Sequence, residues 1–365
     1  MNIHKIVEAA MKTGASDIYF VQGDAPYFRV DDHIKHLQHD PLTQENMEAV
    51  METFIPDYLR AKLDKIRGVD AGYTFDNMVR CRAIAFYERQ KLQVVVRLIP
   101  LKPLSIEQLE LPPVLHDIAR LRNGLVLVTG PTGSGKSTTM AAMIDLINEN
   151  HHKCITTIEN PIEYVHQNKK SIIFQRDVGD DVPDFNTGLI QSLRQAPDII
   201  LLGEMRDLET MRTSIRAAEI GHLVMSTLHT VSAVQTIQRI VSVYPETEHD
   251  LVREQLSHSL KAVITQDLVR RIEGKGRIAA CEIMVVNAPI RKLIYENQID
   301  DIYEVIRRKD DGMRTFDQDL ARLTSLERIT KEEAEAHSAD AWAYRRFLKG
   351  VASSSDSGGI ISSFE

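Results

Sequence analysis

The chain has 365 residues, of which 43% are hydrophobic and 26% charged, and its formal net charge is −8. This length allows two or three domains with cores of their own, and the composition is typical of a globular protein. The acidic balance disfavours nonspecific nucleic-acid binding, which depends on a basic face. The three cysteines form no CxxC pair, which argues against a zinc module or a disulfide framework and fits a reducing compartment.

The sequence predicts no membrane-inserted segment. No stretch approaches the roughly 20 apolar residues that a membrane span requires. The N-terminal sequence MNIHKIVEAAMK lacks the apolar run of a signal peptide and places Ile3, Ile6, Val7 and Ala10 at helical spacing. We therefore expect a cytoplasmic protein that begins with an amphipathic helix and reaches a membrane only through a partner.

Residues 1–98 are predicted to form a small α+β domain. Strands are expected at residues 17–21 and 27–30, on either side of a turn that contains Gly and Pro. One helix is predicted over residues 41–63, with Thr43 as its N-cap. Further strands are expected at residues 71–75, 80–86 and 92–98.

Four prolines between residues 99 and 113 predict a restrained linker between two domains. Residues 114–350 are predicted to form the second domain, in which strands and helices alternate as in a doubly wound parallel sheet before a helical C-terminal part begins near residue 289. The Ser/Gly-rich segment 351–365 is predicted to be disordered. The strands expected in this domain are residues 125–129, 154–159, 198–203 and 223–227.

Residues 130–137, GPTGSGKS, form a complete Walker A sequence between a predicted buried strand and a helix predicted at residues 138–150. Phosphate binding requires this order, because glycines let backbone N–H groups turn inward and the helix N-terminus adds partial positive charge. Lys136 is expected to reach the β- and γ-phosphates, and Ser137 to offer its hydroxyl to Mg²⁺. The residues predicted to bind a nucleoside triphosphate are Gly130, Pro131, Thr132, Gly133, Ser134, Gly135, Lys136, Ser137 and Thr138.

Hydrolysis also requires carboxylates that organise Mg²⁺ and the attacking water, and candidates occur at two predicted strand ends. Glu204 ends the apolar segment PDIILLGE, a Walker B pattern with Glu in place of the usual Asp, and is predicted to act at the metal with Ser137. Glu159 and Glu163 follow another predicted strand in the segment TIENPIEY. For each of these acids the alternative is an ordinary exposed or salt-bridged loop residue.

Two histidines bracket the predicted strand at residues 223–227 in the segment GHLVMSTLHT. His222 and His229 lie on a β-α unit next to the predicted P-loop strand, so one of them is a candidate sensor of the γ-phosphate. The alternative is that each is a hydrogen-bonded structural residue. A basic segment that contains Arg270, Arg271 and Arg277 indicates a solvated or subunit-contact face rather than a nucleic-acid groove.

The blocks GPTGSGKS, IENPIEY, RQAPDIILLGEMRDLET and GHLVMSTLHT, in this order, resemble those of secretion-superfamily ATPases. Within that superfamily they are most similar to the PilT/PilU-type retraction ATPases of type IV pili. The resemblance extends from residue 1 to about residue 345 and includes APIRKLIYENQIDDI, which resembles the retraction-specific AIRNLIRE helix. Pilus assembly and type II secretion ATPases are longer and usually contain a four-cysteine zinc module, and this sequence has neither feature.

The resemblance implies a PAS-like domain over residues 1–98, a RecA-like P-loop ATPase domain over residues 114–350, and ATP with Mg²⁺ bound between them in a homohexamer. It implies a cytoplasmic enzyme that is peripheral at the inner membrane through the pilus platform protein. It also implies roles for individual residues. These are Glu163 as catalytic base, Glu204 as the Walker B acid, His222 and His229 as the His box, and Arg82 and Arg97 as N-terminal arginines that reach the nucleotide.

The predicted function is ATP hydrolysis that powers pilus retraction and twitching motility. Some blocks are closer to PilU (SDIYF, SLRQAPD) and others to PilT (GEMRDLET, STLHT). The alternatives are therefore an accessory PilU-like motor beside a second retraction ATPase, and a weakly hydrolysing regulatory ring. The regulatory alternative is suggested by Asn160, which stands where the family usually has Asp. A nucleic-acid translocase of the same fold is disfavoured by the acidic balance.

Overall fold

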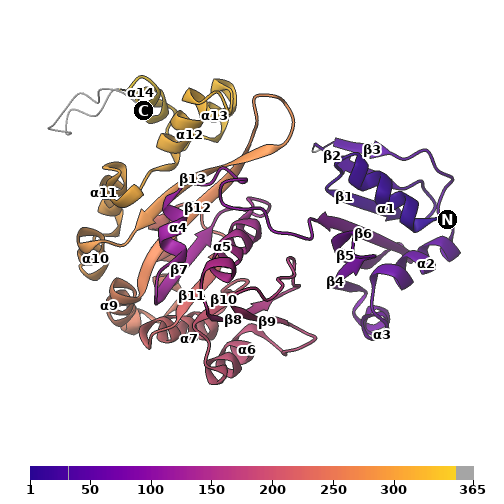
Figure 1. The fold of residues 1–365 in the computed structure, drawn as a ribbon, viewed down its shortest axis with the longest axis horizontal. Helices are drawn as coiled ribbons and strands as arrows, with labels where there is room; N and C mark the ends of the chain where they lie inside the picture. The colour runs from indigo at the N-terminus through magenta and orange to yellow at the C-terminus, as the bar shows by residue number, and fades with distance from the viewer. Residues whose placement is uncertain (32, 351–365) are drawn as a thin grey trace. The chain divides into compact units, whose positions relative to one another are not determined.

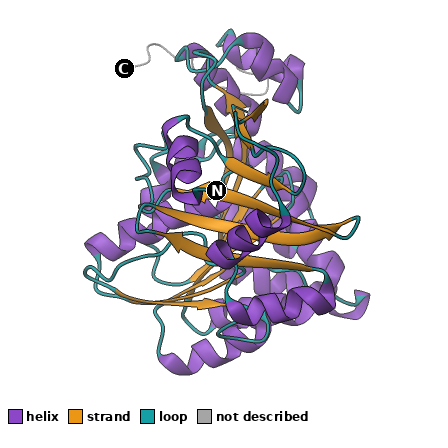
Figure 2. Ribbon diagram, turned by 90° about the vertical axis from the view of Figure 1, so that its right-hand side faces the viewer, coloured by secondary structure: helices purple, strands orange, loops and turns teal. Residues whose placement is uncertain are grey.

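A computed structural model describes residues 1–31 and 33–350 of the chain (Figure 1). Contacts divide the chain into unit 1, Met1–Pro103 with Glu159–Gln167, and unit 2, Leu104–Ile158 with the chain from Asn168 onward. Each unit has its own sheet, and the apolar core of unit 1 is separate from the cores of unit 2. Figure 2 distinguishes helices, strands and loops in a second view. The segment 351–365, predicted to be disordered, lies outside the described residues.

Unit 1 contains a six-stranded antiparallel sheet in the order β3-β2-β1-β6-β5-β4, packed against helices through one apolar core. Its elements are α1 (Ile3–Lys12), β1 (Asp17–Val21), β2 (Tyr27–Val30), β3 (His33–His36), α2 (Gln44–Phe54), α3 (Asp57–Ile66), β4 (Gly68–Phe75), β5 (Val79–Glu88) and β6 (Lys91–Ile99).

The amphipathic pattern of the N-terminal residues is confirmed, since α1 buries Ile6, Val7 and Ala10. The single helix predicted over residues 41–63 is wrong, because two helices, α2 and α3, occupy this segment. Ile55 precedes a proline and is therefore extended, with φ −113° and ψ 117°, which ends α2. Pro56 then becomes the N-cap of α3.

Unit 2 contains a seven-stranded sheet in the order β13-β12-β7-β11-β10-β8-β9. Its strands are β7 (Gly124–Thr129), β8 (Cys154–Glu159), β9 (Ile172–Asp177), β10 (Ile199–Leu202), β11 (Leu223–Leu228), β12 (Leu260–Arg270) and β13 (Arg277–Val285). Its helices are α4 (Val114–Ala119), α5 (Lys136–Asn150), α6 (Phe185–Ser192), α7 (Leu208–Glu219), α8 (Ala233–Val243), α9 (His249–Ser259), α10 (Ala288–Tyr295), α11 (Ile302–Arg307), α12 (Phe316–Ser325), α13 (Lys331–His337) and α14 (Ala341–Leu348).

Alternate residues of the buried strands belong to two separate cores, as the two-residue period of a strand requires. In β7, Leu125 and Leu127 belong to the core that also contains residues of α7 to α11. Val126 and Val128 belong to the core that contains residues of α4 and α5. The predicted parallel, doubly wound arrangement is confirmed for β7, β11, β10 and β8, and β12 adds a further parallel strand beside β7.

The strands β9, β12 and β13 were not predicted from the sequence. β12 begins at Leu260 directly after α9 ends at Ser259, so no turn residues mark the boundary between helix and strand. The hairpin of β12 and β13 adds an antiparallel edge to the parallel sheet, with Arg270 paired to Arg277 at its tip. The predicted basic segment therefore occupies a hairpin end.

The order of the strands places the Walker A loop at a switch point. β7 lies between β12 and β11, while the chain runs from β7 through α5 to β8 further along the sheet. Ligands of open parallel sheets bind at such points, beyond the carboxyl ends of the strands. Among the described residues, no helix is long and apolar enough to cross a bilayer.

Candidate functional site

The Walker A loop joins the carboxyl end of β7 to the first turn of α5. Gly135 is the N-cap of α5, with φ 86°, and no side chain caps this helix end. The N-terminus of α5, with the positive end of the helix dipole, therefore faces the loop without a capping side chain, as in anion-binding helix ends. Lys136 Nζ donates hydrogen bonds to the carbonyl oxygens of Gly130 and Pro131, each at 2.8 Å, which places its ammonium group at the loop.

The loop is supported by β12, the strand that the sequence patterns missed. Gly130 has φ 137°, and a Cβ at this position would lie 2.1 Å from the carbonyl oxygen of Gln266, so only glycine fits. Gln266 Nε2 donates to the carbonyl oxygen of Ser134 at 2.6 Å. The hydroxyl groups of Thr129 and Thr265 form a hydrogen bond of 2.8 Å immediately before the loop.

A cavity of about 250 Å³ adjoins the loop within unit 2. Thr138 and Thr139 of α5 line it together with Leu268 of β12 and the two hairpin arginines, Arg271 and Arg277. Its lining combines apolar side chains with a few polar groups, as is usual for a small-molecule site. Apart from Thr138, sequence reasoning did not place these residues at the site, because no local pattern relates the hairpin to the loop.

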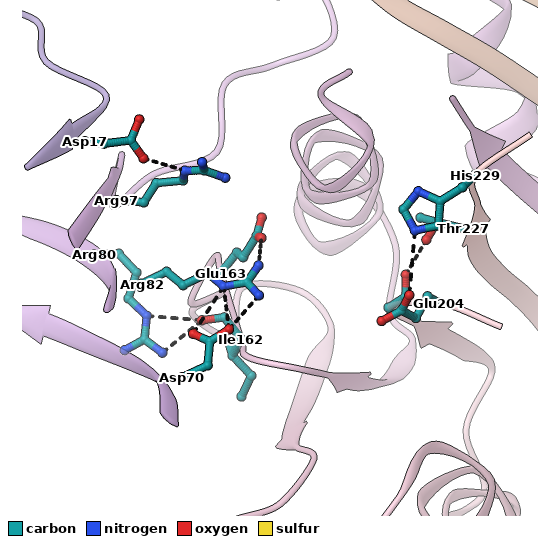
Figure 3. A network of polar contacts seen from close by, with 11 residues as sticks. Asp17, Asp70, Arg80, Arg82, Arg97, Ile162, Glu163, Glu204, Thr227 and His229 are labelled. Atoms are coloured by element: carbon teal, nitrogen blue, oxygen red, sulfur yellow. Dashed lines mark hydrogen bonds and ion pairs between the residues drawn. The ribbon is translucent and has the colours of Figure 1, made fainter. Parts of the chain in front are cut away.

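Glu204 and His229 meet at the carboxyl edge of the same sheet (Figure 3). Glu204 follows β10, and its carboxylate lies 3.7 Å from His229 Nε2 and 2.5 Å from Arg206 Nε. The strand ends are tied together by Thr227 Oγ1, which donates to the carbonyl oxygen of Gly203 at 2.5 Å. The structure therefore brings together two of the residues that were predicted separately.

His222 lies at the opposite edge of this sheet. The parallel register pairs Leu223 with Gly124, at the start of β7, and Leu228 with Thr129, at its end. At about 3.3 Å per residue, β11 separates His222 from the carboxyl edge by roughly 20 Å. His222 Nδ1 lies 2.8 Å from the carbonyl oxygen of Pro197, where it forms a local hydrogen bond. Of the two predicted histidines, only His229 accompanies Glu204.

Glu163 belongs to unit 1, where it contacts Arg82 of β5. Arg82 Nη1 lies 3.3 Å from Glu163 Oε1, and Arg82 Nη2 donates to Asp70 Oδ2 at 2.6 Å (Figure 3). Burial lowers the pKa of Arg82, but the carboxylates of Asp70 and Glu163 outweigh this effect and raise it above its usual value. Arg80 Nη2 donates to the carbonyl oxygen of Ile162 at 2.9 Å. Two arginines of one strand thus hold the segment that contains Glu163.

Arg97 is the cross-strand partner of both Arg82 and Asp17. Directly opposite residues share one face of a sheet, so Arg82, Arg97 and Asp17 form a row across β5, β6 and β1. Arg97 Nε donates to Asp17 Oδ1 at 2.9 Å, and Arg97 remains 56% exposed while Asp17 is buried. The two arginines that the sequence suggested individually are neighbours.

A Walker A loop at the switch point of a parallel sheet, with an acid at the end of a nearby strand, defines a P-loop ATPase domain of the RecA-like class. The family model described as "Type II/IV secretion system protein" matches residues 1–334. The chain belongs to this family, and its relatives place it among the PilT/PilU-type ATPases.

Two curated relatives come from Pseudomonas aeruginosa. The type IV pilus retraction ATPase PilT is 42% identical over 335 residues, which cover 92% of this chain and 97% of that protein. The type IV pilus ATPase PilU is 35% identical over 350 residues, which cover 96% of this chain and 92% of that protein. A crystal structure of the pilus retraction motor PilT with bound ADP superposes with a TM-score of 0.86 at 41% identity, covering 95% of this chain and 99% of that chain.

Proposed function

We propose that this protein hydrolyses ATP as a homohexameric motor that powers retraction of type IV pili and twitching motility. The observation that supports the proposal most directly is the intact phosphate loop. The ammonium group of Lys136 lies against the Gly130 carbonyl of this loop, and α5 follows without a capping side chain. A retraction motor of the same fold is known with bound ADP. The working location is the cytoplasmic face of the inner membrane, where a pilus platform protein is the expected partner.

Within unit 2, the loop residues hold the phosphates and Lys136 neutralises charge on the β- and γ-phosphoryl groups. The adjoining cavity, lined by Thr138, Leu268 and the hairpin arginines, suits the nucleoside. The nucleoside would then contact both α5 and the β12–β13 hairpin. Glu204 and His229 are the proposed pair that responds to the γ-phosphate, and the 3.7 Å between the Glu204 carboxylate and His229 Nε2 supports a joint role.

The residues present fit Mg²⁺ as the metal partner of ATP. Ser137 supplies a hydroxyl at the start of α5 and Glu204 a carboxylate at the same sheet edge, both of them oxygen ligands of the kind that Mg²⁺ requires. Across the described residues, no cluster of three or more His, Cys, Asp or Glu residues forms a metal cage. This agrees with a Mg²⁺ site completed by phosphate oxygens and water. When bound, the ion would neutralise phosphate charge.

Within unit 1, Glu163 is the proposed catalytic base, and Arg82 and Arg97 are the proposed cationic groups that stabilise the transferring phosphoryl group. Arg82 bonds to both Asp70 and Glu163. A phosphate that recruits Arg82 would therefore release Glu163 to accept a proton from water. His222 receives a structural role in this proposal, because its ring nitrogen bonds to the carbonyl of Pro197.

The direct test measures phosphate release by the purified protein with Mg²⁺ and ATP, with the variant Lys136→Ala assayed in parallel. We expect Mg²⁺-dependent turnover that this substitution abolishes. Size-exclusion chromatography with light scattering should report a mass near six copies of the 41.3 kDa chain. ATP turnover without assembly into a hexamer, or assembly without ATP turnover, would contradict the proposal of a homohexameric motor.

A second candidate is the accessory motor that acts beside another retraction ATPase. The specific observation in its favour is the match to PilU, which covers 96% of this chain. Expression in a strain that lacks its main retraction ATPase separates the two functions. Restored twitching identifies a main motor. Restoration only when another retraction ATPase is present identifies the accessory one.

A further inference from the structure

Glu282 of β13 is a buried carboxylate, 6% exposed, that the proposed chemistry does not use. Among the described residues, no Lys, Arg or His forms an ion pair with it. Its Oε1 accepts a hydrogen bond of 2.7 Å from the backbone N–H of Ala233, the first residue of α8. A carboxylate at a helix N-terminus is stabilised by the helix dipole and by such a charge-assisted bond. Glu282 thus anchors the beginning of α8.

The anchored helix end is close in sequence and in space to His229. β11 ends at Leu228, and Ala233 begins α8 only four residues after His229. The short connection is tightened by a hydrogen bond of 2.6 Å between the hydroxyl groups of Thr230 and Thr236. A displacement of the first turn of α8 is therefore transmitted to His229 through few rotatable bonds.

Strand register places Glu282 in the row of paired residues at the carboxyl edge of the parallel strands, where the Walker A loop and His229 follow. Glu282 pairs with Thr265, Thr265 with Thr129, and Thr129 with Leu228. This row crosses four strands and includes the residue before the Walker A loop and the residue before His229. Because paired residues share one sheet face, the carboxylate lies on the face against which α8 packs.

We propose that Glu282 is a positioning residue for ATP hydrolysis, which holds the N-terminus of α8 and thereby keeps the His229 imidazole beside the Glu204 carboxylate. The inference rests on the proposed role of His229 at the γ-phosphate. It connects the β12–β13 hairpin to His229 through the hydrogen bond between Glu282 and the first residue of α8. Glu282 is proposed to act through α8, because its carboxylate bonds to the backbone of Ala233.

The surroundings of Glu282 make this anchor sensitive to protonation. Burial, and less strongly the nearby Asp317 carboxylate, raise the pKa of Glu282 to about 7, against the lowering effect of the Ala233 N–H. The titratable groups that face it are Asp317 of α12 and Tyr303 of α11, while β12 presents Thr265 and α8 the backbone of Ala233. Protonation removes the charge that strengthens the bond to α8.

The test compares Glu282→Ala and Glu282→Gln with a matched carboxylate elsewhere. Asp184 is the N-cap of α6 and accepts a hydrogen bond of 2.7 Å from Thr187 N, so Asp184→Ala removes a similar helix-capping bond away from His229. For Glu282→Ala we expect kcat to fall tenfold or more, with KM for ATP changed less than about threefold. Asp184→Ala should leave kcat within twofold.

Glu282→Gln retains an acceptor and guards against a failure of the alanine variant to fold. It should recover much of the kcat lost in Glu282→Ala, but its turnover should no longer decrease as the pH falls through about 7, the pKa of Glu282. Hydrogen-exchange mass spectrometry should show faster exchange over residues 229–236 in Glu282→Ala. Unchanged kcat in both variants, or equal losses of kcat and melting temperature in Glu282→Ala and Asp184→Ala, would overturn the proposal.

Failure of the proposed function gives a different result. If the wild-type protein releases no phosphate, the ATPase proposal fails, and the anchor is then judged by exchange alone. If hydrogen exchange over residues 229–236 is unchanged in Glu282→Ala, then Glu282 does not anchor α8, even where ATP turnover is normal. Faster exchange together with normal turnover shows an anchor that does not position His229 and also overturns the inference.

Discussion

The candidate residues of the two units are held in place in different ways. In unit 2, Lys136 and Glu204 follow β7 and β10, strands in which every residue is buried. In unit 1, Arg82 and Arg97 lie on strands, but their guanidinium groups are held by the carboxylates of Asp70 and Asp17. A buried strand cannot shift without losing close packing. An ion pair between exposed groups contributes only about 0–1 kcal/mol, and the Arg97 side chain is 56% exposed.

This difference suggests different roles for the two units in the proposed function. In the proposed function, the groups of unit 2 that follow buried strands determine where phosphate binds. In the same proposal, the ion-paired arginines of unit 1 would exchange a protein carboxylate for a phosphate group, because each offers two anionic oxygens to the N–H donors of the guanidinium fork. Substitution of Lys136 in unit 2 should therefore abolish binding or chemistry outright, whereas substitutions in unit 1 should alter turnover and leave nucleotide binding intact.

The largest effect is expected for Lys136→Ala. Removal of the ammonium group at the loop should bring phosphate release to background, a loss of at least about 10³-fold, because charge on the transferring phosphoryl group is no longer neutralised. Isothermal titration calorimetry should show weaker ADP binding. Lys153→Ala is the control, since Lys153 forms a partly exposed ion pair with Asp198 and has no proposed role in nucleotide binding. Wild-type turnover in Lys136→Ala would show that the working site is elsewhere.

Glu163→Gln should lower kcat by about 10³-fold and leave ATP binding intact, because an amide cannot accept the proton of water. Glu204→Gln should instead raise the Mg²⁺ concentration required for half-maximal turnover. Titrations of Mg²⁺ and single-turnover rates distinguish these effects. Normal turnover in Glu163→Gln with an inactive Glu159→Gln would reverse the assignment within this segment.

Arg82→Ala and Arg97→Ala should each lower kcat by about 10²-fold without changing the assembled mass, which tests the unit 1 side of the comparison. Arg29→Ala is the matched control, because Arg29 occupies the same cross-strand row and also contacts Asp17. Mixing Arg97→Ala with Lys136→Ala asks whether the arginine acts on a neighbouring subunit. Activity above that of either variant supports action across subunits, and normal turnover of the single arginine variants contradicts the assignment.

The stability of the wild-type protein should decrease by on the order of 2 kcal/mol as the pH rises from about 4.5 to about 7 because of Glu282. Its raised pKa means that the folded state binds the proton more tightly than the unfolded state. The stability that protonation of Glu282 provides is fully present below the pKa of Glu282 in the unfolded chain. It is lost as the pH rises through the pKa of Glu282 in the folded protein. Urea unfolding across this range should show a flatter pH dependence for Glu282→Gln. Identical slopes would refute the effect.

The smallest effect is expected for Asn160→Asp. Asn160 lies in the segment that the contact division places in unit 1, three residues before Glu163. If its amide serves as a hydrogen-bonding group, the added charge should change kcat by no more than a few-fold. A gain of tenfold or more, about 1.4 kcal/mol of barrier, from a nearly inactive wild type would favour the regulatory alternative.

Much of the fold followed from local sequence patterns. The bounds predicted for β1, β2 and β8 are those observed, because each is a short segment rich in β-branched or aromatic residues that is followed by turn residues. The single helix predicted over residues 41–63 is wrong because Pro56 forces the preceding Ile55 into an extended conformation, although the helical periodicity continues across it. The Walker A loop was evident because its function depends on consecutive residues.

The sequence by itself determined which residues form the phosphate loop and which acids end the apolar strands, since these properties depend on neighbours along the chain. Tertiary structure decided that Gln266 supports the loop, that Arg82, Arg97 and Asp17 share one row, and that His229 rather than His222 lies beside Glu204. These contacts depend on strand order and register, which join segments many residues apart. Periodicity within one segment reports which face is buried, but not which strand will lie next to it.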